Sequence, residues 1–200
     1  MEMTGFEKYF VNRETKVRRN IEAVRQSLSR LPVDQIHDVL ELGCGIGGVS
    51  AFLAEEYGLN VLGTDYDPEQ IAIAKEKYPE RECLHFRAED ASRMSFADLS
   101  FDLVLAQDVF HHIASWEAAV AEVGRVLRPG GYLIWMDFAY PRIVKGVFRP
   151  FVRHYGLYTW ADILGTFTEA GLETGQVERP RHGPFAYSRA ILQKSDRKAA

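Results

Sequence analysis

The sequence predicts an α/β fold: a doubly wound, mostly parallel seven-stranded sheet with a reversed C-terminal strand and helices on both faces. Two observations support this prediction. Between residues 39 and 136, five short apolar runs alternate with helical patterns, which is typical of parallel strands covered by helices. Two further strands are expected at residues 172–178 and 185–193, close enough in sequence to pair antiparallel at a sheet edge.

Each element of this pattern has a local signal. Residues 6–31 carry apolar side chains every three or four positions, which predicts one or two amphipathic helices ended by Pro32. Asp67 followed by Pro68 is typical of a helix start, and Gly58 and Gly171 stand where glycines commonly end helices. The expected strands lie at 39–42, 60–64, 84–87, 101–106 and 132–136, and the expected helices at 49–57, 68–78, 116–127 and 160–170.

Length and composition limit the class of protein. The chain has 200 residues, of which 46% are hydrophobic and 26% charged, and a formal net charge of −4. This is the composition of an ordinary globular protein, and its acidic balance argues against a dedicated nucleic-acid binder. No apolar run is long enough to cross a membrane and no signal peptide is visible, so we expect a cytoplasmic protein without a transmembrane segment.

Cysteine usage also agrees with a cytoplasmic protein. Cys44 and Cys83 are the only cysteines, and they do not form a metal-binding pattern. A lone pair is weak evidence for a disulfide when no export signal is visible. We therefore expect two reduced cysteines and no metal site.

A turn with four glycines, at positions 43, 45, 47 and 48, joins the first strand to a helix. Residues without side chains let a ligand approach the backbone, and the helix N-terminus favours negative charge. The spacing Gly43-x-Gly45-x-x-Gly48, with Asp65 about 20 residues further on, satisfies the dinucleotide fingerprint. The turn therefore predicts a site for an adenosine-containing cofactor, without deciding which one.

The residues from Glu41 to Gly47 resemble motif I of the class I S-adenosylmethionine-dependent methyltransferases, whose pattern is acidic-x-Gly-x-Gly-x-Gly. Further segments agree with this family in order and spacing: 61–68, 88–91, 100–113 and 125–131. The resemblance covers residues 38–137, and the last two strands resemble the reversed end of the family's sheet. It implies S-adenosylmethionine as cofactor and methyl transfer by in-line displacement. We expect a small-molecule acceptor, because the sequence shows no added domain or extended basic surface.

The resemblance also implies how the first motifs hold the cofactor. The backbone around Gly43, Gly45 and Gly47 would lie against its methionine and ribose parts. Glu41 would orient this turn or the cofactor's amino group. Asp65 would accept hydrogen bonds from the ribose hydroxyls.

Later motifs would complete the cofactor site. Tyr66 is expected near the adenine, Asp90 would accept a hydrogen bond from the adenine amino group, and Ala91 would offer a backbone N–H. Glu89 could replace Asp90 after a shift of one residue. Gln107 is expected to face the methionyl end, with an ordinary polar residue at a strand end as the alternative.

Candidates for general acid–base catalysis follow the fourth strand. His111 and His112 titrate near neutral pH, and Asp108 is a comparable candidate. A structural role at a helix start is the alternative for the histidines. An acceptor that is already nucleophilic, such as an amine or thiolate, would need no base.

A basic, aromatic stretch follows the fifth strand and carries Arg142, Lys145, Arg149 and Arg153. These residues would share one side of a continuous helix, although Pro150 makes continuity doubtful. Arg142, Arg149 and Arg153 could attract a carboxylate or phosphate of the acceptor. A solvated cationic face, or binding to a membrane surface, are the alternatives.

The resulting organisation is one methyltransferase domain over residues 1–200. It comprises an N-terminal helical cap (1–32), a cofactor-binding core (36–137), a substrate-side insert (138–160), a C-terminal helix with the antiparallel strand pair (161–193) and a tail (194–200). A nicotinamide-dependent oxidoreductase and a catalytically inactive cofactor-binding module remain the alternatives. The sequence does not identify the acceptor or the oligomeric state.

Overall fold

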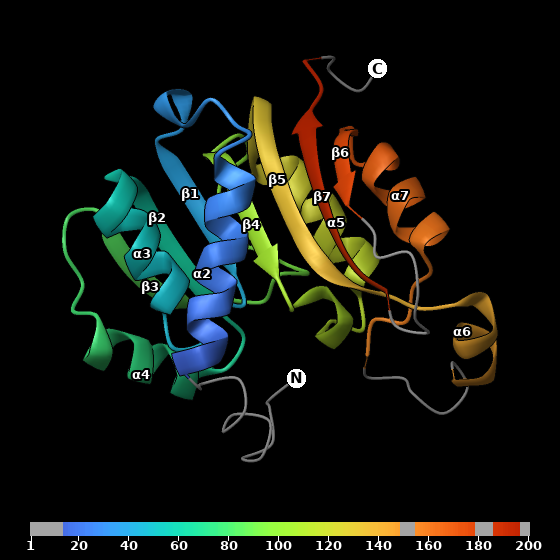
Figure 1. Ribbon diagram of the computed structural model, residues 1–200, viewed down its shortest axis with the longest axis horizontal. Helices are drawn as coiled ribbons and strands as arrows, with labels where there is room; N and C mark the ends of the chain where they lie inside the picture. Colours follow the sequence, from blue (N-terminus) through green and yellow to red (C-terminus); the bar gives the residue numbers. More distant parts are fainter. Residues whose placement is uncertain (1–13, 149–154, 179–185, 197–200) are drawn as a thin grey trace. The chain divides into compact units, whose positions relative to one another are not determined.

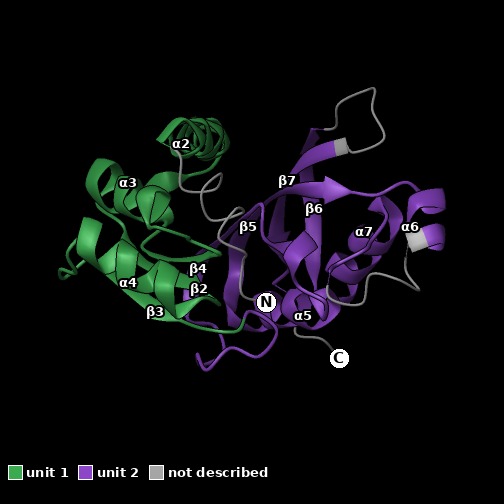
Figure 2. Ribbon diagram, turned by 90° about the horizontal axis from the view of Figure 1, so that it is seen from below, with its two compact units in different colours: residues 1–90 green, residues 91–200 purple. Residues whose placement is uncertain are grey.

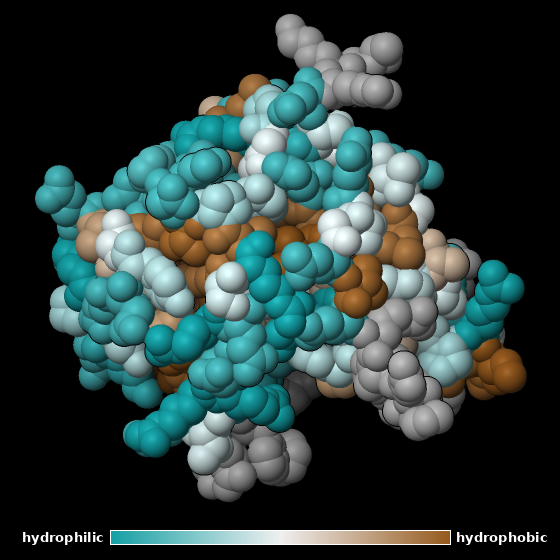
Figure 3. Space-filling model, turned by 45° about the horizontal axis from the view of Figure 1, so that its top comes forward, coloured by the Kyte–Doolittle hydropathy of each residue, from teal (hydrophilic) through white to brown (hydrophobic). Residues whose placement is uncertain are grey.

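The computed structural model describes residues 14–148, 155–178 and 186–196. The chain divides into two compact units, Met1–Asp90 and Ala91–Ala200 (Figure 2). Charged and polar side chains cover much of the face seen in Figure 3. No helix of the described residues is long and apolar enough to span a membrane. The expectations of a single domain and of a cytoplasmic location stay predictions.

The first unit contains three parallel strands and their helices (Figure 1). Its strand order is β3-β2-β1, with Val39 paired to Val61 and Val61 to Leu84. Its elements are α2 (Glu14–Leu28), η1 (Val33–Gln35), β1 (Asp38–Leu42), α3 (Gly48–Tyr57), β2 (Asn60–Asp65), α4 (Pro68–Lys77) and β3 (Leu84–Ala88).

Local chemistry fixes the ends of these helices as predicted. The Asp67 side chain accepts a hydrogen bond from the Glu69 amide, and Pro68 occupies the first position of α4. Gly58 ends α3 in the left-handed conformation that disfavours side chains. The helix predicted before Pro32 is α2, which ends at Leu28; the residues before Glu14 lie outside the described part of the chain.

The second unit contains the other four strands in the order β4-β5-β7-β6. Strands β4 and β5 are parallel, whereas β7 runs antiparallel to both β5 and β6. Its elements are β4 (Phe101–Gln107), η2 (Phe110–His112), α5 (Trp116–Val126), β5 (Leu127–Ala139), α6 (Arg142–Phe148), α7 (Trp160–Glu169), β6 (Leu172–Glu178) and β7 (Ala186–Lys194). The predicted fold class, a mostly parallel seven-stranded sheet with a reversed strand near its C-terminal end, is confirmed.

Strand β5 is longer than the predicted 132–136 because it begins at Leu127 and includes residues 128–131. Phe101 pairs with Leu127 and Leu103 pairs with Tyr132, so the residues between Leu127 and Tyr132 bulge out of the ladder. Gly130 allows this with a φ of 76°. Residues 128–131, part of the segment 125–131 named in the resemblance, therefore lie within β5 as a bulge.

The basic stretch also differs from its prediction. Helix α6 ends at Phe148, and residues 149–154, which include Arg149 and Arg153, lie outside the described residues. Ile143 and Val147 are 81% and 55% exposed. These two apolar side chains of α6 therefore face solvent.

Candidate functional site

Strand β1 leads into the glycine turn, which two main-chain hydrogen bonds hold in shape. The Cys44 amide donates to the Thr64 carbonyl at 2.8 Å, and the Gly47 amide donates to the Cys44 carbonyl at 2.9 Å. The φ angles of 53° at Gly45 and 81° at Gly47 lie in the left-handed region, where a side chain costs free energy. The predicted glycines thus build a tight loop from the end of β1 to α3.

Asp65, at the end of β2, is joined to this loop. Its Oδ2 accepts a hydrogen bond from the Gly45 amide at 2.9 Å, and its Oδ1 accepts one from the Asp67 amide at 2.9 Å. The side chain is buried, and burial is the main reason why the pKa of its carboxyl is raised. The strand end and the turn, 20 residues apart in sequence, therefore form one hydrogen-bonded unit.

Glu41 lies beneath the turn and is only 4% exposed. Its carboxylate accepts a hydrogen bond from the Ser50 hydroxyl of α3, and its carbonyl accepts one from Thr64 Oγ1 at 2.9 Å. Burial, with a smaller contribution from the charge of Asp65, raises the pKa of Glu41 to about 7. Glu41 thus links β1 to the first turn of α3, a partner that the sequence did not predict.

The remaining candidates of the first unit differ in burial. Tyr66 is 52% exposed and Asp90 is exposed, whereas the Glu89 side chain is only 10% exposed and lies 3.4 Å from Arg87 Nε. The Glu89 amide donates to the Asp65 carbonyl at 2.9 Å, so the ends of β2 and β3 are adjacent. Glu89 is therefore the more enclosed of the two acidic candidates after β3.

In the second unit, Ala91 begins a loop that Arg125 of α5 holds in place. The Arg125 guanidinium donates to the carbonyls of Phe96 at 2.7 Å and Met94 at 3.1 Å. Glu122 pairs with Arg125 and also accepts a hydrogen bond from the Met94 amide at 2.7 Å. Sequence reasoning missed this clamp, because neither residue is close to the loop along the chain.

Gln107 and Asp108 lie at the end of β4, as predicted. Gln107 is buried and forms a hydrogen bond with the Tyr187 hydroxyl, while its Oε1 has no hydrogen-bond partner among the described residues. Asp108 has a φ of 55°, unusual for a residue with a side chain, and its amide donates to the Met136 carbonyl at 2.9 Å. Strand β4 thus ends at a sharp change of backbone direction. The buried Gln107 Oε1 beside it can accept a hydrogen bond from a ligand.

His111 forms a close pair with Asp137 at the end of β5. His111 Nδ1 lies 2.5 Å from Asp137 Oδ1, and the side chains are 15% and 1% exposed. The His111 ring also lies 4.0 Å from that of His112, centroid to centroid. The sequence assigned no role to Asp137, although an acid directly after the apolar run 133–136 was the available signal.

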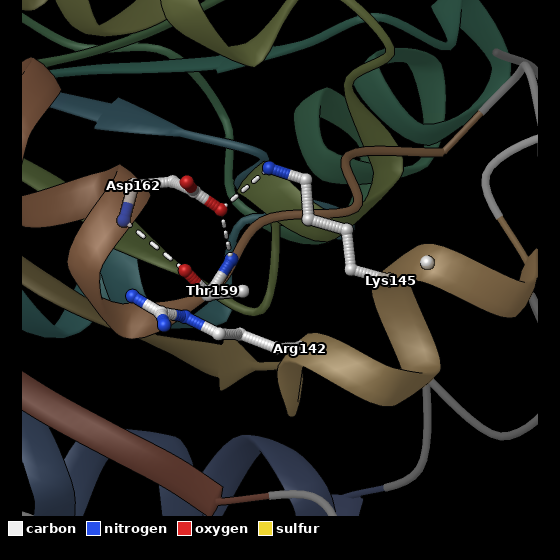
Figure 4. A pocket seen from close by; sticks show the side chains of 5 residues that line it. Arg142, Lys145, Thr159 and Asp162 are labelled. Atoms are coloured by element: carbon white, nitrogen blue, oxygen red, sulfur yellow. Dashed lines mark hydrogen bonds and ion pairs between the residues drawn. The ribbon is translucent and has the colours of Figure 1, made fainter.

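A shallow hollow of about 230 Å³ lies between α6 and the start of α7. It is lined by Arg142, Lys145, Gly146, Thr159 and Asp162 (Figure 4). Lys145 Nζ lies 2.6 Å from Asp162 Oδ2, the same oxygen that accepts the Thr159 amide in the capping box of α7. Lys145 is thereby neutralised, and Arg142 is the described member of the predicted basic set that forms no ion pair within the described residues.

The glycine turn after β1, the Asp65 carboxylate bonded to it and the mostly parallel sheet are features of a Rossmann-like fold. Residues 40–135 match the family model described as a methyltransferase domain. The resemblance to the class I S-adenosylmethionine-dependent methyltransferases expected from the sequence is confirmed over these residues. This match favours S-adenosylmethionine over the nicotinamide cofactor of the oxidoreductase alternative.

Three curated relatives illustrate the similarity. The chain is 40% identical over 100 residues to the 2-methyl-6-phytyl-1,4-hydroquinone methyltransferase of Synechocystis, 35% over 134 residues to the demethylmenaquinone methyltransferase of Beutenbergia cavernae, and 30% over 118 residues to phosphoethanolamine N-methyltransferase 1 of Triticum aestivum. These alignments include 50%, 67% and 58% of this chain. They span only 31%, 52% and 24% of the relatives' own lengths.

A solved structure supports the fold. The phosphoethanolamine N-methyltransferase 2 of Haemonchus contortus, in complex with phosphomonomethylethanolamine and S-adenosylhomocysteine, matches with a TM-score of 0.73 at 18% identity. The match covers 89% of this chain and 53% of that chain. At this identity the likeness concerns the fold alone.

Proposed function

We propose that the chain transfers a methyl group from S-adenosylmethionine to a small-molecule acceptor. The observation that carries this proposal is the hydrogen bond from the Gly45 amide to Asp65 Oδ2. It fixes the glycine turn against the carboxylate at the end of β2, in a chain that matches the methyltransferase family model. The three curated relatives, named for methyl transfer to small molecules, support the same reaction.

The residues of the first unit fit an adenosine cofactor. Each Asp65 oxygen accepts one backbone N–H, and a carboxylate oxygen has a second lone pair, so both can also accept a ribose hydroxyl. The backbone of Gly43, Gly45 and Gly47 would lie along the ribose and methionine parts. Glu41 would act through Ser50 by holding the turn on α3.

The other predicted contacts complete the proposed site. Tyr66, which is half exposed, would pack against the adenine. Asp90 or the less exposed Glu89 would accept a hydrogen bond from the adenine amino group. Ala91 would offer its backbone N–H to the ring. Gln107 Oε1, buried without a partner among the described residues, would accept a hydrogen bond from the methionyl amino group.

When bound, the cofactor supplies an electrophilic methyl carbon on a sulfonium, and the sulfur is the leaving group that keeps the bonding electron pair as a neutral thioether. The protein's part is to hold the acceptor atom in line and at contact distance, since positioning alone can supply about 7–11 kcal/mol of the barrier. The turn between β1 and α3 is suited to this because its hydrogen bonds and left-handed glycines leave it little freedom.

We infer that the acceptor includes an anionic group. Arg142 lines the hollow beside α7 and forms no ion pair within the described residues, whereas Lys145 on the same helix is paired with Asp162. Arg149 and Arg153, named with it from the sequence, lie outside the described residues. The relative from Triticum aestivum is named for phosphoethanolamine, an acceptor with a phosphate group. Replacing Arg142 by Ala should raise the KM for an anionic acceptor about tenfold or more and leave kcat unchanged.

Calorimetry and a transfer assay test the proposal together. S-adenosylhomocysteine should bind and NAD(H) should not, and radiolabelled methyl groups should pass to members of a small-molecule panel. Binding of NAD(H) in place of S-adenosylhomocysteine would overturn the proposal. Tight binding of S-adenosylhomocysteine with no transfer to any panel member would instead identify an inactive binding module.

A further inference from the structure

Helix α6 carries two aliphatic side chains that are exposed to solvent. Ile143 is 81% exposed and Val147 is 55% exposed. They are four positions apart, so they lie on the same side of the helix, one turn from each other. Single exposed apolar side chains are ordinary on a protein surface, whereas this pair occupies one side of a helix of only seven residues. We call Ile143 and Val147 the aliphatic face of α6.

The surroundings of the aliphatic face are open. Gly146 follows Ile143 by three positions and precedes Val147, and a Cβ built on Gly146 would meet nothing within 4 Å. Figures 1 and 2 show α6 beyond α7, apart from the strands of the second unit. Helix α6 is therefore a peripheral element, and its aliphatic face is accessible to a partner.

The opposite side of α6 is attached to α7. Lys145 Nζ lies 2.6 Å from Asp162 Oδ2, and Figure 4 shows the Lys145 side chain leaving α6 toward Asp162. Around a helix with 3.6 residues per turn, Lys145 lies about 160° from both Ile143 and Val147. The ion pair therefore holds α6 with its aliphatic face turned away from α7.

The charge beside the aliphatic face is positive. In the sequence, residues 138–161 contain four arginines and lysines and no acidic residue, although the chain has a formal net charge of −4. Arg142, next to Ile143, is exposed and forms no ion pair within the described residues. Because Asp162 neutralises Lys145, Arg142 supplies the positive charge of α6. This side of α6 is therefore complementary to an anionic surface.

An aliphatic pair bordered by a cation matches the boundary of an anionic bilayer. Aliphatic side chains enter the acyl region there, while basic side chains stay among the phosphates. A protein partner matches less well, because a stable protein interface buries about 800 Å² on each side, far more than two side chains provide. We propose that α6 docks the protein on an anionic phospholipid surface, with Ile143 and Val147 inserted between the lipids. This goes beyond the methyltransferase function proposed above and does not depend on it.

Sedimentation of the full chain with lipid vesicles tests the proposal. The wild type should bind vesicles that contain phosphatidylglycerol more strongly than vesicles of phosphatidylcholine alone, and about 0.5 M NaCl should weaken this binding. The double variant Ile143→Ser, Val147→Ser should bind the anionic vesicles about tenfold or more weakly. Arg142→Ala should bind them about fivefold more weakly at low salt.

Val177→Ser provides the matched control, because Val177 is an aliphatic side chain that is 41% exposed on β6. It should bind vesicles as the wild type does. Urea unfolding should give the same midpoint for the wild type, the double variant and the control, since the substituted side chains are exposed. A weaker interaction with vesicles then reports the surface and not the fold.

A fluorescent label locates the inserted side chain directly. The polarity-sensitive NBD group, attached to Ile143→Cys, should shift its emission to shorter wavelength when anionic vesicles are added, whereas the same group on Val177→Cys should not. Cys83→Ser in both proteins removes the accessible native thiol, since Cys44 is buried.

Three results would each overturn the inference: no binding of the wild type to anionic vesicles, equal binding by the double variant, or an unchanged emission from the label at position 143. Self-association of the wild type that the double variant abolishes, without vesicle binding, would overturn it in favour of a second copy of the chain. Binding of S-adenosylhomocysteine and methyl transfer test the proposed function separately, so the two proposals fail independently.

Discussion

The Gly45 amide nitrogen lies 2.9 Å from Asp65 Oδ2, so the carboxylate proposed to hold the ribose is already part of the glycine turn. A second backbone amide, that of Asp67, occupies the other oxygen. Changes at Asp65 should therefore affect the turn and the ligand together. The charge of Asp65 and the shape of the turn are coupled through main-chain hydrogen bonds.

Asp65→Asn should weaken both stability and cofactor binding. The new amide NH₂ would face one of the two backbone N–H groups, leaving a buried donor unsatisfied at a cost of about 1–3 kcal/mol. We expect a lower unfolding free energy in urea and at least about tenfold weaker binding of S-adenosylhomocysteine by calorimetry. Asp34→Asn, in the exposed part of η1, should change neither quantity. Wild-type affinity in Asp65→Asn would contradict the assignment.

Glu41 should make stability depend on pH. Its folded pKa of about 7 lies above the ordinary glutamate value of 4.5, so the folded protein binds a proton that the unfolded chain has lost. This contribution destabilises the fold as the pH rises from about 4.5 to 7, by about 3 kcal/mol in total. In Glu41→Gln this slope should disappear. Urea unfolding at pH 5 and pH 8 measures it, and identical slopes in both proteins would refute the prediction.

Gly47→Ala should cost more stability than Gly58→Ala. Both glycines have left-handed φ angles, which cost about 1–2 kcal/mol for alanine. A Cβ on Gly47 would lie 2.7 Å from two atoms of the Phe86 ring, whereas a Cβ on Gly58 would meet nothing within 4 Å. Because the cost of the left-handed φ angle is common to both variants, the difference between their losses of unfolding free energy, about 1–3 kcal/mol, measures the cost of the clash with Phe86. Adding Phe86→Leu to Gly47→Ala should recover part of it, and equal losses in the two single variants would disprove the steric account.

Arg125→Met should release the loop that follows Ala91. The loss of hydrogen bonds to the Met94 and Phe96 carbonyls should speed amide hydrogen exchange at residues 94–99 about tenfold or more. Because Ala91 is a proposed adenine contact, S-adenosylhomocysteine should also bind more weakly. Arg93→Met, an exposed position in the same loop, provides the control. Unchanged exchange would show that Arg125 does not hold the loop.

Features with local causes were predictable from the sequence. Asp67, Pro68 and Gly58 act on the residues next to them, so the ends of α3 and α4 follow from their chemistry. The glycine turn was also predictable, because few residues other than glycine adopt the left-handed angles at Gly45 and Gly47.

Features that depend on distant partners were not predictable. Asp137 and His111 are 26 residues apart, and no local pattern relates a strand end to the helical turn that follows another strand. The bulge in β5 depends in the same way on pairing between Phe101 and Leu127. The link between Glu41 and Ser50 is closer in sequence, yet it requires knowing which side of α3 faces β1.

The carboxylate of Asp137 is held by the amides of His111 and Phe138, groups that every amino acid except proline provides. Substitutions of the surrounding side chains can therefore alter the shape and polarity around His111 without turning its imidazole ring. The orientation of this ring depends on the course of the main chain at two strand ends and not on the side chains beside it.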